Sequence, residues 1–138
     1  FDNPETPAGA NAAMQRAQER HGPIDGWALM GGWPLYDPSG LDGIPGDVTI
    51  VSMDPLPPAL DFLDSGRVAT LVAQPYYGWG FESVRLLFEK QHYDKTPEQA
   101  VINPAVRVVT PEDSNSYRAE WYRWDGAPVI DPSTVGSD

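Results

Sequence analysis

The sequence predicts an α/β fold built on a mostly parallel sheet. Three short apolar runs, residues 26–30, 48–53 and 68–73, have the composition of buried strands. Segments with helical periodicity precede, separate or follow these runs, so the chain alternates between helix and strand. Such alternation is typical of parallel strands joined by crossovers, which α/β proteins pack against layers of helices.

The N-terminal half opens on a predicted helix. Residues 8–21 place small and apolar side chains on one face, and Gly22-Pro23 ends the helical pattern. The strand at 26–30 follows, and its short, continuously apolar sequence predicts burial on both faces. Residues 34–47 are rich in Gly, Pro and Asp, which predicts a loop with one helical turn.

Two further helices flank the strand at 68–73. The first begins at Pro57-Pro58, where missing N–H groups cost little, and ends near Gly66. The second, residues 78–91, has the clearest helical pattern of the chain. Its apolar residues form a single stripe: Phe81, Val84, Leu87 and Phe88.

The C-terminal part adds one more strand and one more helix. Residues 105–109 alternate and contain β-branched side chains, which predicts a strand. Thr110-Pro111 then supplies an N-cap and a first-turn proline for a helix over residues 114–124. Residues 125–138 have no period and are predicted to be a loose tail.

Composition narrows the functional class. A chain of 138 residues with 41% hydrophobic residues fits one folded domain. The formal net charge of −11 argues against nucleic acid and anionic membrane surfaces as partners, because both require a basic face. The absence of cysteine excludes disulfides and thiol catalysis.

Three residues that could bind a ligand follow the three apolar runs, and each precedes a proline. They are Trp33, Asp54 and Gln74. In an open parallel sheet, ligands bind beyond the carboxyl ends of the strands. A carboxylate accepts hydrogen bonds, an amide both donates and accepts, and an indole can cover the C–H side of a sugar ring. Gly32 allows close backbone approach, so the set suits a polyhydroxylated ligand bound without chemistry.

Structural roles compete with this interpretation. Asp and Gln before proline are common turn residues, and Trp33 can cap the core. The aromatic residues of segment 76–79 can pack on the sheet edge or form a wall of the ligand crevice.

Metal, cofactor and catalytic signals are weak. The aspartates in 34–47 lack the alternating pattern and closing Glu of a calcium loop, so we expect no metal. No nucleophile elbow, zinc-protease motif or phosphate loop occurs, and we expect neither a cofactor nor enzymatic activity. An enzyme that uses Asp54 as a base is the rival hypothesis.

Several short motifs, in order, resemble one family. They are Met53-Asp54, Asp64-Ser65-Gly66, Ala73-Gln74-Pro75, the Gly-x-x-Ser-Val run at 80–84, and the Val-Val-Thr-Pro-Glu-Asp run at 108–113. The set is similar to the C-terminal lobe of type I periplasmic sugar-binding proteins of ABC transporters, the ribose-binding class. The similarity spans about residues 2–124.

The resemblance implies a three-layer, Rossmann-like lobe over residues 1–124, with the N-terminal lobe and the first strand of this lobe absent. It implies sugar binding between two lobes, delivery to an ABC permease, and an extracytoplasmic or periplasmic location, either free or as a membrane-anchored lipoprotein. Asp54 and Gln74 fall on sugar-hydroxyl contacts of the family, and Asn3 falls near another. Where many members have Asn-Asp, this chain has Gly32-Trp33, which suggests stacking in place of a polar contact.

Two further expectations follow from the resemblance. The effector-binding domain of a LacI-type transcription regulator shares this fold and is the alternative function. A sheet that lacks a strand leaves an open edge, which favours association into a homo-oligomer.

Overall fold

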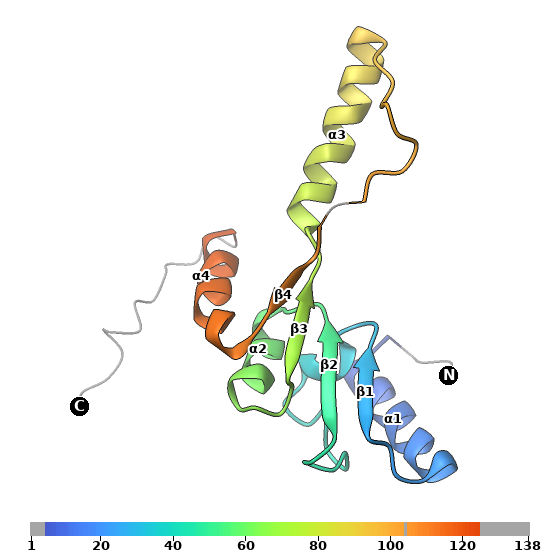
Figure 1. Cartoon of the computed structure of the whole chain (residues 1–138), viewed down its shortest axis with the longest axis vertical. Coiled ribbons are helices and arrows are strands. Elements are labelled where there is room, and N and C mark those ends of the chain that lie inside the picture. The colour runs from blue at the N-terminus through green and yellow to red at the C-terminus, as the bar shows by residue number, and fades with distance from the viewer. Residues whose placement is uncertain (1–4, 104, 125–138) are drawn as a thin grey trace, which may run out of the picture.

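A four-stranded sheet in the order β1-β2-β3-β4 forms the centre of the computed structural model, which describes residues 5–103 and 105–124. Strands β1 (Gly26–Leu29), β2 (Thr49–Met53) and β3 (Thr70–Ala73) are parallel. The short strand β4 (Arg107–Val109) runs antiparallel to β3 (Figure 1). The expected α/β class with a mostly parallel sheet is confirmed.

The expected helices form, with bounds that differ by a few residues. They are α1 (Pro7–His21), α2 (Pro57–Asp64), α3 (Tyr76–Tyr93) and α4 (Ser114–Trp124), with 3₁₀ turns η1 (Trp33–Tyr36) and η2 (Pro111–Asp113). The Thr6 hydroxyl caps α1 by accepting a hydrogen bond from the Gly9 N–H at 3.1 Å. Gly66, at φ 73°, follows α2 in the left-handed conformation that glycine adopts without strain.

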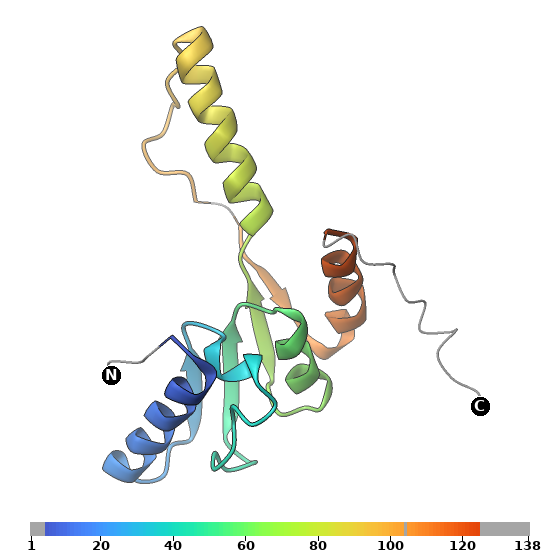
Figure 2. The ribbon, with the colours of Figure 1, turned by 180° about the vertical axis from the view of Figure 1, so that it is seen from behind.

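The core lies on one face of the sheet. Strand pairing aligns Leu29, Ser52, Leu71 and Val109 in one row, and α1, η1, α2 and α4 cover that face (Figure 2). Residues with no exposed surface include Leu35, Ile50, Leu60, Leu63, Leu71 and Val109. Arg118 of α4 donates hydrogen bonds to the Pro57 carbonyl and to the carboxylates of Asp61 and Asp64 at 2.7–3.2 Å, which fixes α4 against α2.

The opposite face of the sheet is open, because α3 projects beyond the strand ends instead of lying across it (Figure 1). No residue of α3 is buried. The expectation that 26–30 is buried on both faces is therefore wrong: Gly26 and Ala28 are exposed, while Trp27 and Leu29 are half-buried against the core. None of the described helices combines the length and apolarity needed to cross a membrane.

Truncating an isoleucine inside the core and one outside it should have different effects. Ile50 has no exposed surface and Ile102 is 52% exposed. We expect Ile50→Ala to lower the free energy of unfolding by about 2–5 kcal/mol, from lost burial and a residual cavity. Ile102→Ala, the matched control, should change it by less than about 1 kcal/mol. Urea denaturation of both variants measures the two changes. Equal losses of unfolding free energy would contradict a core on the helix-covered face of the sheet, where Ile50 lies.

Candidate binding site at the strand ends

A hollow of about 400 Å³ lies at the carboxyl ends of β2 and β3. Six residues from four parts of the chain line it: Tyr36, Asp54, Leu56, Gln74, Tyr76 and Trp121. Asp54 directly follows β2 and Gln74 directly follows β3. Parallel pairing of β2 with β3 brings these ends together, as the 20-residue spacing predicts.

Asp54 is the centre of the polar contacts. Its Oδ1 accepts hydrogen bonds from Gln74 Nε2 at 2.7 Å and from the Tyr76 hydroxyl, and its Oδ2 accepts one from the Gly32 N–H at 3.4 Å. Residues after β1, β2 and β3 thus meet on one carboxylate. The structure brings together three of the five sequence-predicted site residues, namely Gly32, Asp54 and Gln74.

The backbone of Asp54 is in the left-handed region, at φ 65°. Only Asp94 shares a positive φ among the described non-glycine residues, and it ends α3. This conformation costs most residues about 1–2 kcal/mol, and aspartate tolerates it better than most. Strained backbone of this kind is concentrated at ligand sites, where the surrounding structure holds it in place.

Aromatic side chains wall the hollow. The rings of Tyr76 and Trp121 lie 6.4 Å apart at 47°, and Trp79 meets Tyr76 edge to face at 5.9 Å. Burial, with the nearby Asp54 charge, raises the pKa of Tyr36 to about 12. Burial and the hydrogen bond to Asp54 raise the pKa of Tyr76 as well. Both phenols therefore stay protonated at neutral pH and can act as donors.

Trp33 lies outside this hollow. It lines a neighbouring hollow of about 440 Å³ between α1 and β1, and its ring meets Tyr36 edge to face at 5.8 Å. Tyr36 takes the aromatic position beside Asp54. A Cβ on Gly32 would lie 2.7 Å from the Tyr36 hydroxyl oxygen, so a larger residue at position 32 would displace the Tyr36 ring. Ligand stacking by Trp33 stays a prediction. Asn3 lies outside the described residues.

Sequence reasoning did not identify Tyr36 or Trp121 as site residues. Tyr36 is in the 3₁₀ turn that follows β1, and Trp121 is in α4, which packs on the core through Tyr117 and bonds α2 through Arg118. Proximity to a strand end could have suggested Tyr36. No local pattern could have suggested Trp121, which reaches the hollow only through tertiary packing.

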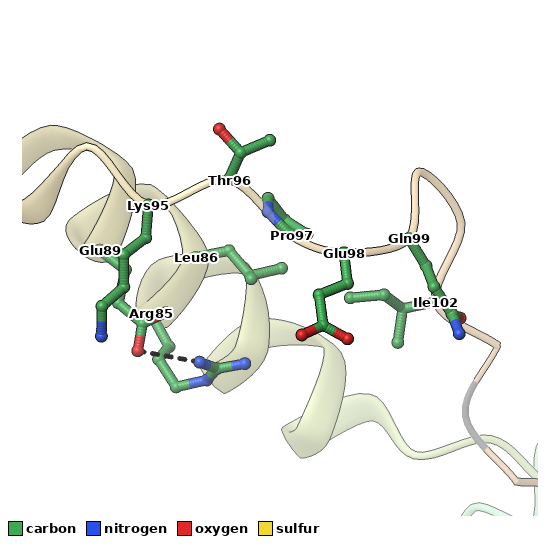
Figure 3. Close-up of a pocket in the computed structure, with 9 residues that line it drawn as sticks. All are labelled: Arg85, Leu86, Glu89, Lys95, Thr96, Pro97, Glu98, Gln99 and Ile102. Atoms are coloured by element: carbon green, nitrogen blue, oxygen red, sulfur yellow. Dashed lines mark hydrogen bonds and ion pairs between the residues drawn. The ribbon is translucent and has the colours of Figure 1, made fainter.

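A larger hollow, about 510 Å³, lies on α3 and the segment that returns from it (Figure 3). Two of its charged residues, Arg85 and Glu89, form an ion pair along the helix at 3.0 Å. It lies away from the strand ends. Across residues 5–103 and 105–124, no three acidic or histidine side chains gather to hold a metal ion.

Comparisons with solved structures place the fold. The chain is similar to a glucose-galactose binding protein from Geobacillus stearothermophilus (19% identity, TM-score 0.67, covering 78% of this chain and 39% of that one). It is also similar to an ABC transporter solute-binding protein from Bacillus halodurans with bound myo-inositol (24% identity, TM-score 0.66, covering 83% of this chain and 40% of that one). A third similar structure is a carbohydrate transporter solute-binding protein from Agrobacterium radiobacter in complex with D-arabinose (17% identity, TM-score 0.69, covering 86% of this chain and 41% of that one).

These likenesses confirm the fold resemblance to periplasmic sugar-binding proteins. The chain spans about two-fifths of the length of the solved structures it matches. No family model matches the sequence, and no curated protein matches it.

The left-handed backbone at Asp54 gives a stability prediction. Asp54→Ala and Asp54→Gly both remove the carboxylate, so the difference between them reports the backbone alone. We expect the glycine variant to be more stable than the alanine variant by about 1 kcal/mol, because alanine pays the left-handed penalty and glycine does not. Guanidinium unfolding of the pair provides the measurement. An alanine variant as stable as the glycine variant would contradict the conformation at φ 65°.

The raised pKa of Tyr36 gives a pH prediction. An unfolded tyrosine loses its proton near pH 10, whereas Tyr36 in the fold holds it until about 12. The stabilisation is therefore complete below pH 10 and is lost as pH rises through that interval, because only the unfolded state ionises. We expect the free energy of unfolding to fall more steeply above about pH 10 in the parent chain than in Tyr36→Phe. The measurement is urea denaturation of both proteins at several pH values. If the free energy of unfolding falls equally steeply with pH in both, the prediction is wrong.

Proposed function

We propose that this chain is a ligand-binding lobe of a solute receptor, and that its ligand is a small polyhydroxylated molecule of the sugar class. The observation that carries the proposal is the convergence of Gly32, Gln74 and Tyr76 on the Asp54 carboxylate in an aromatic-walled hollow. The hollow lies where α/β sheets bind ligands, beyond the carboxyl ends of parallel strands.

The chemistry of the hollow suits hydroxyl groups. An ionised Asp54 accepts two or more hydrogen bonds, and Gln74 both donates and accepts. Tyr36, Tyr76 and Trp121 offer apolar faces that can cover the C–H faces of a sugar ring. A sugar hydroxyl would replace Tyr76 or Gln74 as donor to Asp54, so the internal hydrogen bonds hold the carboxylate in position while no ligand is bound.

The similar solved structures support the same class. They are a glucose-galactose binding protein, a solute-binding protein with bound myo-inositol and a carbohydrate transporter solute-binding protein in complex with D-arabinose. We therefore propose binding without chemistry, delivery of the ligand to an ABC permease, and an extracytoplasmic location. The open hollow of this lobe alone encloses little of a ligand, and a second lobe that closes over it, as in a two-lobed receptor, would bury the remaining surface.

The test uses Asp54→Asn in the two-lobed protein that this proposal implies. Asparagine keeps the size of the side chain and tolerates the left-handed backbone, so it removes the charge without adding strain. We expect sugar affinity to fall by about 2 kcal/mol, from the loss of charge-assisted hydrogen bonds. Asp47→Asn, an exposed loop carboxylate, is the matched control and should bind as the parent does.

Isothermal titration calorimetry against a panel of pentoses, hexoses and inositols gives the readout. Unchanged affinity in Asp54→Asn would remove Asp54 from the site. Binding of amino acids or nucleosides instead of sugars would change the ligand class. Turnover of a bound sugar would favour the enzyme hypothesis.

A further inference from the structure

Two apolar surfaces of this chain are exposed although their composition is that of a core. The first, the helical stripe of α3, consists of Tyr77, Phe81, Val84, Leu87 and Phe88, each 51–72% exposed. The second is the open face of the sheet. It includes two rows, Ala28–Val51–Thr70 and Met53–Val72–Val108, and the pair Gly26–Thr49, as strand register defines them.

Neither surface has the polar character expected of a solvent-facing layer. The two rows of the open sheet face contain no charged residue. Val51 is 38% exposed and Val108 is 56% exposed on that face. On α3, the charged side chains Glu82, Arg85 and Glu89 pair with one another away from the helical stripe. Contiguous apolar surfaces of this kind mark interaction sites.

The chain connection explains why α3 leaves its own sheet uncovered. A parallel crossover must carry the chain back along the sheet, so the connections from β1 to β2 and from β2 to β3 run across one face. Strand β4 is antiparallel to β3 and begins near the end where β3 finishes. The connection that contains α3 therefore need not cross the sheet, and α3 extends outward (Figure 1).

The returning segment does not cover the helical stripe. It passes along the side of α3 that carries Arg85, Leu86 and Glu89, where it contributes Ile102 (Figure 3). Residues 81, 84 and 88 lie on a different side of the helix, as the helical period requires. Among the described residues, nothing packs over the helical stripe.

We propose that α3 of one copy packs its helical stripe onto the open sheet face of a second copy, and that the second copy returns the same contact. Both surfaces are present on every chain. A two-fold dimer therefore covers both helical stripes and both open sheet faces, and no surface is left to bind a third copy. The interface uses the face of the sheet, whereas the sequence alone predicts association through its edge. It does not depend on the proposed function.

The areas suffice for a stable dimer. A helix of 18 residues is about 27 Å long and about 10 Å wide, which gives a footprint of about 300 Å². Four strands about 4.8 Å apart, with about 3.3 Å per residue, present a face of similar size. Two helices on two faces bury four such surfaces, or about 1,200 Å², the lower bound for specific interfaces.

The first experiment measures the mass of the 138-residue chain by size exclusion with light scattering. We expect twice the monomer mass of 15.1 kDa at about 100 µM protein. Val84→Asp places a charge in the helical stripe and should halve that mass while leaving the far-ultraviolet circular dichroism unchanged. Val101→Asp is the matched control: Val101 is 67% exposed, against 68% for Val84, but it lies outside the stripe, so this variant should remain a dimer.

The second experiment distinguishes a second copy from closure of α3 onto its own sheet. The chain has no cysteine, so Val51→Cys combined with Val84→Cys introduces the only two thiols. We expect mild oxidation to yield a covalent dimer on a non-reducing gel, and none when Val101→Cys replaces Val84→Cys. A monomeric parent chain, a dimer that persists in Val84→Asp, or a disulfide within one chain would each overturn the proposal.

Discussion

Parallel pairing of β1, β2 and β3 is the constraint on which the rest of the molecule depends. It fixes both crossovers to one face, so the core forms there from α1, η1, α2 and α4. It also places the carboxyl ends of all three strands at one edge. The position of Asp54 beside Gln74 and Gly32 follows from this pairing and not from any sequence proximity, since these residues are 20 and 22 positions apart.

Asp54 shows how the strand ends become a site. Its backbone leaves β2 in the left-handed conformation, and its N–H still donates to the Val72 carbonyl of β3 at 3.1 Å. The turn of the backbone and the three donors to its carboxylate fix the same side chain from two directions. Such a carboxylate loses little conformational freedom when a ligand replaces one donor, which favours binding.

The sequence predicted what depends on local pattern and on strand order. Helical period and β-branched runs located every helix and strand to within a few residues, and consecutive β-α units brought Asp54 and Gln74 together. It did not identify Tyr36, although this residue lies in the turn that follows β1. It could not predict Trp121, because this residue reaches the hollow only through packing of α4, which is distant in the chain. Burial on both faces was wrongly expected for 26–30, because strand composition does not reveal that β4 reverses direction and leaves α3 extended.

The helical stripe illustrates the limit of periodicity as evidence for burial. Phe81, Val84 and Phe88 recur at helical spacing, which indicates that this face of α3 is apolar but not which surface it meets. Tyr76 connects this question to the binding site, since it is both the first residue of α3 and a donor to Asp54. Any rotation of α3 about Pro75 moves the Tyr76 hydroxyl relative to the Asp54 carboxylate. A rotation of α3 that accompanied packing of the helical stripe would therefore change the geometry of the hollow, although the two surfaces share no residue.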